Sequence, residues 1–390
     1  MKAVINALAL PSFRQGGAGY YTASLIDGLS GRGPEVSATV LASPALNQEL
    51  ARLAPEASVS VLSQTLPSAP RKLVNYSIAA RAPERLDLGF SGEPSGEADI
   101  VHWPISFMHG PDVSGAVGRV LTVLDLQHEF FPQFFSRRDR ILRRLRWPAS
   151  ARAADHVIAI SDFTRRTVCE RYGVPPERVT AIPLGLRRSF ARSGDASALE
   201  LPPLVEAAGG RWFLYPASPL PAKNHSRLLD ALRLYRERFD PDARLVLTGP
   251  RLHSWDTVER RIAETGLGDA VVCLGHVDDA TLHALYARCT GVIFPSLFEG
   301  FGLPVLEAMA VGCPVAASHA GSLPEVVGCA GPTFSPEHVE EIVGALEWLA
   351  SLEGEARMSA VTAGRRQAAL FSTDAMVDRT LRVYEGLLEG

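Results

Sequence analysis

GVIFPSLFEGFGLPVLEAMAVGCPV, the sequence from Gly291 to Val315, is the stretch that decides the fold. Its apolar residues Val292–Phe294 predict a short buried strand, and the apolar run from Pro304, at a favoured first helical position, predicts a helix. Gly312 is suited to end that helix in the left-handed conformation, and Pro314–Ala317 predicts the next buried strand. Strand, glycine loop, helix and strand follow one another as in a βαβ unit with a parallel sheet.

The glycine loop between this strand and this helix, Gly300-Phe301-Gly302, predicts a phosphate site. Glycines let an anion approach bare backbone N–H groups, and the N-terminal end of a helix carries a partial positive charge. The loop and the helix end would therefore bind one phosphate together.

Two carboxylates, Glu299 and Glu307, flank that loop in the sequence. They would repel a phosphate, whereas a carboxylate accepts two hydrogen bonds side by side and so fits the vicinal diol of a ribose or a hexose. A phosphate site between two such groups predicts a nucleotide-sugar ligand. Taken singly, Glu307 could instead only complement the helix dipole, and Glu299 could be an ordinary loop charge.

Length and composition describe an ordinary globular chain with two domains. The 390 residues exceed what one hydrophobic core usually supports, so we expect two domains of about 180 residues each. The chain is 46% hydrophobic and 21% charged, and no apolar run reaches the roughly 18 residues of a membrane span. The N-terminal segment lacks a basic region and a small-residue cleavage site, so we interpret Val4–Leu8 as a first core strand and not as part of a secretory signal.

Charge and cysteine usage exclude further classes. A net charge of −4 argues against a dedicated nucleic-acid binder. The cysteines are odd in number and share no metal-type spacing, so we expect reduced, mostly buried thiols in a cytoplasmic protein. We expect neither a metal ion nor another cofactor. The five cysteines are Cys169, Cys273, Cys289, Cys313 and Cys329.

A second glycine loop follows the first predicted strand and includes Gly16 and Gly17. It opens an apolar-periodic segment that continues to Leu29 and predicts a helix. Alone such a loop is weak evidence, because glycines also serve plain tight turns, but two loops in one chain fit a ligand gripped from both sides.

Polar residues end two further apolar strands in the first half, Asp99–Pro104 and Val120–Asp125. Ligands of open parallel sheets bind at the carboxyl ends of the strands, so His102, Asp125 and His128 are candidates for a cleft. For each of them, a hydrogen-bonded loop residue is the alternative interpretation.

The second half repeats the alternation of strand and helix. Trp212–Pro216 predicts its first strand, and Lys223 falls just before the following helix, where a cation and free N–H groups can meet one anion. An ordinary surface lysine is the alternative. We predict an α/β fold of two Rossmann-like domains, the first over residues 1–190 and the second over 210–372, joined by a poorly periodic linker.

A basic amphipathic helix is predicted between Arg137 and Arg152, where the chain carries seven arginines and one aspartate next to a group of phenylalanines. This helix could lie on an anionic membrane surface, where a lipid-linked acceptor would be found, or it could form a solvated domain face. Both interpretations stay open. The first one implies that the protein lies peripherally at the inner face of a membrane.

The residues above resemble a retaining glycosyltransferase of family four, with two Rossmann-like domains of the GT-B type facing across a cleft. The resemblance covers nearly the whole chain. Its most specific part is the spacing of Glu299 and Glu307 after Phe294-Pro295-Ser296. The segments Lys223-Asn224-His225 and Asp125–His128 are similar to those of mannosyltransferases that build bacterial surface polysaccharides.

The resemblance implies a role for each matching residue. Glu299 would hold the donor sugar, Glu307 the ribose, and Lys223 would neutralise the leaving diphosphate, which makes Lys223 and Glu299 the catalytic candidates. The candidates for donor binding are Gly16, Gly17, Ser218, Asn224, Val277, Ser296, Gly300, Phe301, Gly302, Leu303 and Glu307. The acceptor-side candidates are His102, Asp125 and His128. The family's usual crossover, with the apolar spacing of residues 373–390, predicts a last helix that packs on the first domain.

The implied reaction is transfer of a hexose, best matched by mannose from GDP-mannose, to a glycan, a lipid-linked or a small-molecule acceptor with retention of configuration. The chain departs from the family in two places: it has Ser218 or Pro219 where many members have an arginine, and Leu124 where many have a histidine. A UDP- or dTDP-sugar donor is an alternative, and so are a nucleotide-sugar epimerase, a sugar phosphorylase and a non-catalytic binding subunit.

Overall fold

The computed structural model describes residues 1–13, 16–33, 36–43, 46, 49–51, 58–61, 98–109, 116–191, 200–251 and 254–390. These residues form two compact units. The first comprises Met1–Gly185 and Ser372–Gly390, and the second comprises Leu186–Phe371. The chain therefore leaves the first unit after Gly185 and returns to it at Ser372.

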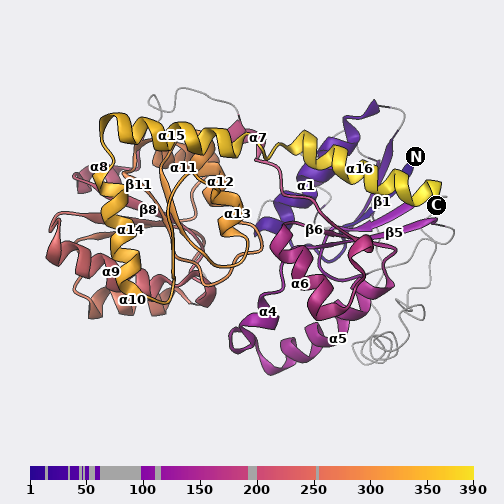
Figure 1. The fold of residues 1–390 in the computed structure, drawn as a ribbon, viewed down its shortest axis with the longest axis horizontal. Coiled ribbons are helices and arrows are strands. Elements are labelled where there is room, and N and C mark those ends of the chain that lie inside the picture. The colour runs from indigo at the N-terminus through magenta and orange to yellow at the C-terminus, as the bar shows by residue number, and fades with distance from the viewer. Residues whose placement is uncertain are drawn as a thin grey trace. The chain divides into compact units, whose positions relative to one another are not determined.

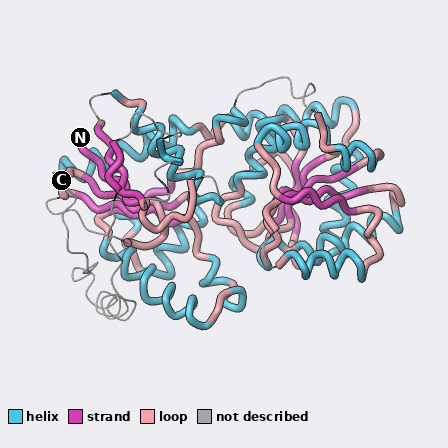
Figure 2. Tube along the Cα trace, turned by 180° about the vertical axis from the view of Figure 1, so that it is seen from behind, coloured by secondary structure: helices cyan, strands magenta, loops and turns pink. Residues whose placement is uncertain are grey.

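The first unit is built on a parallel sheet of seven strands in the order β3-β2-β1-β4-β5-β6-β7. Helices cover this sheet on both faces, as the tube in Figure 2 shows. The strands are β1 (Lys2–Asn6), β2 (Ser37–Ala42), β3 (Ser58–Val61), β4 (Ile100–Trp103), β5 (Gly118–Val123), β6 (His156–Ala159) and β7 (Val179–Ala181). The helices are α1 (Gly16–Ser30), α4 (Gln127–Phe130), α5 (Arg137–Ala153), α6 (Asp162–Tyr172) and α16 (Thr373–Glu389), with short 3-10 turns at Pro132–Phe134 and Pro176–Arg178.

Local capping sets the ends of two of these helices. Ser136 precedes α5 and its hydroxyl accepts a hydrogen bond from the backbone N–H of Asp139 at 3.1 Å. Ser161 caps α6 in the same way through the N–H of Thr164. Such a side-chain acceptor satisfies an N–H that has no partner inside the helix. Gly173 ends α6 at a φ of 65°, a conformation that suits glycine.

The C-terminal helix α16 belongs to the first unit, which confirms the predicted crossover. It lies beside α1, as Figure 1 shows in yellow and indigo. A side chain at Gly28 of α1 would meet Cγ2 of Val377 at 2.4 Å, so the missing side chain allows this close packing. Tyr384 of α16 is completely buried.

The second unit is built on a parallel sheet of six strands in the order β10-β9-β8-β11-β12-β13. The strands are β8 (Trp212–Pro216), β9 (Arg244–Thr248), β10 (Val271–Gly275), β11 (Gly291–Phe294), β12 (Val315–Ser318) and β13 (Thr333–Phe334). The helices are α7 (Arg188–Ala191), α8 (Pro203–Ala208), α9 (His225–Arg238), α10 (Trp255–Glu264), α11 (Asp279–Arg288), α12 (Leu303–Val311), α13 (Leu323–Val327), α14 (Val339–Ser351) and α15 (Gly354–Ala368), with a 3-10 turn at Pro221–Lys223. Both sheets have the Rossmann order, which confirms the predicted fold class.

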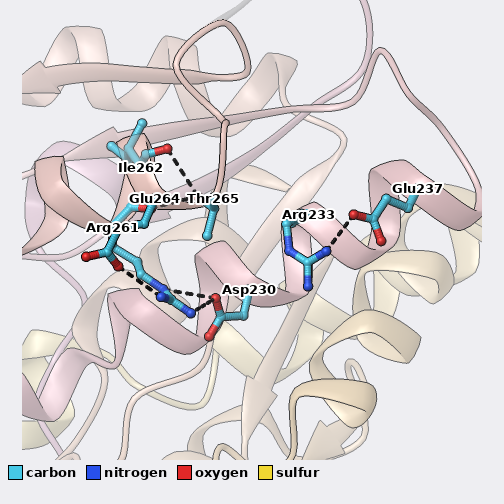
Figure 3. Close-up of polar contacts among 7 residues, drawn as sticks. All are labelled: Asp230, Arg233, Glu237, Arg261, Ile262, Glu264 and Thr265. Atoms are coloured by element: carbon cyan, nitrogen blue, oxygen red, sulfur yellow. Dashed lines mark hydrogen bonds and ion pairs between the residues drawn. The ribbon is translucent and has the colours of Figure 1, made fainter.

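Charged pairs on the outer side of the second unit join neighbouring helices. Figure 3 shows Arg261 of α10 reaching Asp230 of α9, with Nε 3.0 Å from Oδ1, while a second nitrogen contacts Glu264. Arg233 and Glu237 pair along α9 itself. Pairs this exposed contribute at most about 1 kcal/mol each to stability, so the core determines the fold.

The unit boundaries differ from the expected ones. Helix α7 lies at the end of the expected first domain and α8 lies in the expected linker, but both belong to the second unit. The backbone explains where the division falls, because Leu186 donates a hydrogen bond to the carbonyl of Phe371 at 2.8 Å and so joins the two crossing segments. No helix within the described ranges is long and apolar enough to cross a membrane.

Candidate active site

The second sheet has its switch point between β8 and β11, which are neighbours in the sheet although β9 and β10 lie between them in the chain. Chain connections from such a pair diverge to opposite sides, and a crevice forms beyond the carboxyl ends of the two strands. The loops at this point are residues 217–224 and 295–302. They carry Lys223 and the glycine loop predicted from the sequence.

Asn224 fastens these two loops together. Its side-chain amide donates to the carbonyls of Pro295 at 3.0 Å and Pro336 at 2.7 Å. Its backbone has a φ of 59°, and among the described residues no other non-glycine has a positive φ. Asparagine tolerates this left-handed conformation better than most residues. The amide thus holds the two loops in place, and the expected part of Asn224 in donor binding stays a prediction.

Lys223 and Glu299 meet across the two loops. The ammonium Nζ of Lys223 lies 2.5 Å from Oε1 of Glu299, and their side chains are 22% and 12% exposed. Lys223 is also held through its backbone, because its carbonyl accepts a hydrogen bond from the hydroxyl of Tyr215 at 2.5 Å. The cation and the carboxylate that the sequence singled out are therefore in direct contact and reachable from solvent.

The glycine loop adopts the predicted helix-start geometry. Gly302 precedes α12 with a φ of 110°, and a side chain there would lie 2.7 Å from Cδ2 of Leu323. Ser322 holds the loop from below, since its hydroxyl donates to the carbonyls of Glu299 and Phe301 at 3.1 and 2.9 Å. The N–H groups of residues 301–303 have no hydrogen-bond acceptor within the described chain. They are suited to bind an anion.

Glu307 is 2% exposed and lies on the second turn of α12. Its Oε1 accepts a hydrogen bond from Nε of Arg187 at 2.5 Å, and its Oε2 accepts one from the hydroxyl of Tyr286 at 3.3 Å. Burial raises the pKa of Glu307 above its ordinary value, and the guanidinium of Arg187 opposes this shift. Glu307 is thus a buried carboxylate whose charge depends on its partner.

Three other candidates of the second unit differ in how far they are buried. Ser218 is half-buried in the loop after β8, and Val277 is half-buried between β10 and α11. Ser296 is completely buried, and its hydroxyl lies 3.3 Å from that of Tyr215. Its hydroxyl lies beneath the loop, and its part in donor binding stays a prediction.

Four candidates of the first unit follow the carboxyl ends of strands in its own sheet. Gly16 and Gly17 begin α1, and a side chain at either would meet no atom within 4 Å. Asp125 follows β5, and its Oδ1 accepts the N–H of Gln127 at 3.1 Å. His128 is buried, its Nε2 lies 3.2 Å from the hydroxyl of Tyr172, and burial lowers its pKa to about 4.

The sequence suggested that His102 lies at the carboxyl end of its strand, next to a cleft, and the structure differs. His102 is inside β4 and completely buried. Its Nδ1 lies 2.6 Å from the hydroxyl of Tyr384, and its Nε2 lies 2.7 Å from the hydroxyl of Thr122. Burial lowers its pKa to about 3. His102 therefore joins the sheet to α16, and the acceptor-side assignment is corrected.

Sequence reasoning missed three side chains of the site. Arg187 and Tyr286 contact Glu307, and Ser322 supports the glycine loop. Arg187 lies 120 positions from Glu307, so no local spacing relates them. A buried carboxylate nevertheless requires a cation or hydrogen-bond donor as a partner. This requirement was the one indication that Glu307 contacts further side chains.

The chemical content of the site is one lysine, two carboxylates and a helix N-terminus at a Rossmann switch point. These groups are chemically suited to a phosphate with hydroxyl-bearing groups on both sides. The described residues include no group of three or more His, Cys, Asp or Glu side chains arranged to hold a metal ion. The two parallel sheets and their strand order are those of a GT-B-type protein.

Comparison with known families agrees with this class. The family description "Glycosyltransferase Family 4" matches residues 15–190, and "Glycosyl transferases group 1" matches residues 202–367. The two matches together cover most of both units. The chain belongs to glycosyltransferase family 4.

Two relatives are mannosyltransferases by name. The chain is 33% identical over 236 residues to O-antigen chain mannosyltransferase B of Escherichia coli, which covers 60% of this chain and 61% of that protein. It is 32% identical over 238 residues to MMP alpha-(1->4)-mannosyltransferase of Mycolicibacterium hassiacum, over 60% of this chain and 55% of that protein. The matches thus span little more than half of each relative.

A solved structure extends the likeness in fold to the whole chain. Sucrose-phosphate synthase of Thermosynechococcus elongatus superposes with a TM-score of 0.73 at 19% identity, over 100% of this chain and 99% of that one. At this identity the likeness concerns the fold.

Proposed function

We propose that the protein is a retaining glycosyltransferase that moves a hexose from a nucleotide-sugar to an acceptor hydroxyl. The observation that carries the proposal is the convergence of Lys223, Glu299 and the glycine loop at one switch point. A cation and a helix N-terminus supply the positive charge that a departing diphosphate requires.

Each group has a place in this reaction. The N–H groups of Phe301, Gly302 and Leu303 bind the diphosphate, Glu299 accepts hydrogen bonds from the sugar hydroxyls, and Glu307 does the same for the ribose. Lys223 is held beside Glu299 and so stands where sugar and diphosphate would join. No metal ion is needed in this scheme, because Lys223 and the helix meet the charge of the leaving group.

The proposed step breaks the bond between the anomeric carbon and the diphosphate oxygen, and the electron pair goes to the diphosphate. The carbon becomes oxocarbenium-like, and the acceptor oxygen bonds to the same face that the diphosphate leaves. The proton of the acceptor hydroxyl passes to the departing diphosphate. The anomeric configuration is therefore retained.

GDP-mannose is the proposed donor, supported by two relatives that are named mannosyltransferases. A UDP-sugar is the runner-up. A dTDP-sugar fits less well, because it lacks the 2′-hydroxyl and would leave Glu307 with half of the diol that a carboxylate can bind. The acceptor class stays open between a glycan, a lipid-linked molecule and a small molecule.

A cytoplasmic location with peripheral membrane contact is also proposed, through the exposed face of α5. Four of its arginines are exposed, namely Arg137, Arg138, Arg140 and Arg144. Arg143 stacks over the rings of Phe135 and Trp147 instead. The four exposed arginines are the ones that could reach anionic headgroups.

Turnover with a panel of donors tests the function. GDP-mannose, UDP-glucose and dTDP-glucose are each incubated with a mixture of sugar acceptors, and NMR of the anomeric proton gives the product configuration. We expect turnover with GDP-mannose and an α-linked product. A β-linked product contradicts the retaining mechanism. An epimerised donor without acceptor, or turnover that requires inorganic phosphate, identifies an epimerase or a phosphorylase instead.

A further inference from the structure

Arg187 has no role in the catalytic scheme above, yet it makes the shortest contact to Glu307. It follows the crossing segment directly and precedes α7, within the second unit. Its side chain is 10% exposed, and that of Glu307 is 3% exposed. A carboxylate this deeply buried is costly to ionise unless a cation compensates it.

Three contacts hold the guanidinium of Arg187 in one position. Its Nε donates to Oε1 of Glu307 at 2.5 Å, and its Nη1 donates to Oδ1 of Asp279 at 2.6 Å. Its central carbon lies 4.5 Å from the centre of the Phe190 ring. Because a planar guanidinium fixed on three sides has little freedom to turn, Arg187 is built as a fixed support.

The backbone beside Arg187 is anchored to the glycine loop as well. The N–H of Leu186 donates to the carbonyl of Phe371, and the ring of Phe371 packs edge-on against Phe301 with 5.6 Å between the centres. The segment that carries Arg187 and the loop that would bind the diphosphate are thus joined through one residue.

The remaining capacity of Glu307 matches a diol. An ionised carboxylate accepts about four hydrogen bonds, and the contacts described for Glu307 use one on each oxygen. One position per oxygen is left, which fits two adjacent hydroxyl groups. Protonation would turn one oxygen into a donor and remove this match.

We propose that Arg187 is the positioning residue of the donor site, which keeps Glu307 ionised and oriented so that it recognises the 2′- and 3′-hydroxyls of a nucleoside diphosphate. The inference rests on the proposed function. It adds a residue and a recognition rule that the family match does not provide: selectivity for ribose over deoxyribose depends on Arg187.

Binding of GDP, 2′-deoxy-GDP and inorganic pyrophosphate to the full chain tests the inference by calorimetry. The parent should bind GDP at least about tenfold more tightly than 2′-deoxy-GDP, since hydrogen bonds to charged groups are the strong ones. Arg187→Met should reduce this ratio to below about threefold and leave pyrophosphate affinity within about twofold, because pyrophosphate has no ribose. Arg187→Lys should restore part of the ratio. Arg188→Met is the control, since it removes an exposed arginine one position away.

Two binding results overturn the proposal. If Arg187→Met keeps the parent's ratio, Glu307 does not depend on Arg187. If Arg187→Met binds GDP more tightly than the parent, Arg187 blocks access of the nucleotide to Glu307 and does not position it.

A second measurement does not depend on nucleotide binding. Glu307 faces Arg187, Asp279 and Tyr286. An acid whose pKa is raised on folding costs stability as the pH rises, and loss of Arg187 enlarges this cost. The melting temperatures of the parent and Arg187→Met should therefore diverge from about pH 5 to about pH 8. A difference that is constant with pH overturns the positioning role, even if no nucleotide binds and the proposed function has failed.

Discussion

Lys223 and Glu299 are 76 residues apart in the chain, and their charged groups are in contact at 2.5 Å. The contact exists because β8 and β11 are neighbours at the switch point, so the loops that follow them face each other. A ligand that enters here meets a cation and a carboxylate already oriented, with the N-terminus of α12 beside them. Such preorganised charge is the main means by which enzymes stabilise a developing anion.

Lys223→Ala should cost about a hundredfold or more in kcat, because the charge on the diphosphate grows as the glycosidic bond breaks and Lys223 is the cation placed to meet it. The melting temperature should change little, since the ion pair is partly open to solvent. Steady-state kinetics and thermal melts measure both effects. Arg233→Ala on the outer face of α9 is the control for loss of one exposed cation. A kcat within a few-fold of the parent would move the search for the phosphate partner to Gly16 and the arginines of the first unit.

Glu307→Gln should raise the donor KM and leave kcat within a few-fold, because ribose contacts hardly change along the reaction. The glutamine keeps the shape of the side chain, so Arg187 and Tyr286 stay covered. Kinetics over a range of donor concentrations separate the two constants. A fall in kcat at saturating donor would show that Glu307 acts on the transition state and not on ground-state binding.

Salt-sensitive binding to anionic vesicles is expected through α5. Attraction to such a surface is worth about 1 kcal/mol per nearby basic residue, so the four exposed arginines together supply enough. Sedimentation with phosphatidylserine vesicles should show binding at low salt that disappears when all four are replaced by glutamine. Replacing Arg233 and Arg238 of α9 by glutamine is the control, since both are exposed but lie on the second unit. If the parent does not sediment at low salt, α5 is a solvated face.

His102 should make the first unit sensitive to acid. Its pKa is lowered from 6.5 to about 3 by burial, and a base whose pKa falls on folding contributes stability that is lost as the pH drops below the unfolded value. Unfolding free energy measured with denaturant should therefore decline from about pH 6.5 downward, by up to about 1.4 kcal/mol per pH unit for this residue.

His102→Gln should give a shallower decline than the parent over the same range. His128 and His225, each with a pKa lowered to about 4 by burial, add to the decline in both proteins, so only the difference between the proteins reports on His102. His276→Gln, at an exposed position after β10, should keep the parent's slope. An unchanged slope in His102→Gln would mean that the ring is not buried as described.

The sequence by itself determined the order of the elements and the start of α12. Apolar runs, the proline at Pro304 and the glycines at Gly302 and Gly312 act over a few residues, so β11, α12 and β12 lie within about two residues of the predicted positions. The Ser161 cap is another local interaction, with an N–H three positions further along the chain. The family follows from the same stretch, because its signature is a local spacing of two glutamates.

Only the tertiary structure decided which of these side chains are open and which are buried. His102 follows the apolar run of a strand and looked like a strand-end residue, but the interior of a parallel strand is covered on both faces, and Thr122 and Tyr384 supply its partners from 20 and 282 positions away. Arg187 contacts Glu307 because the chain passes beside α12 where it enters the second unit. No sequence periodicity encodes a contact over 120 positions. Long-range contacts depend on strand order and on the direction in which each side chain leaves its element, and these are fixed only when the sheet assembles.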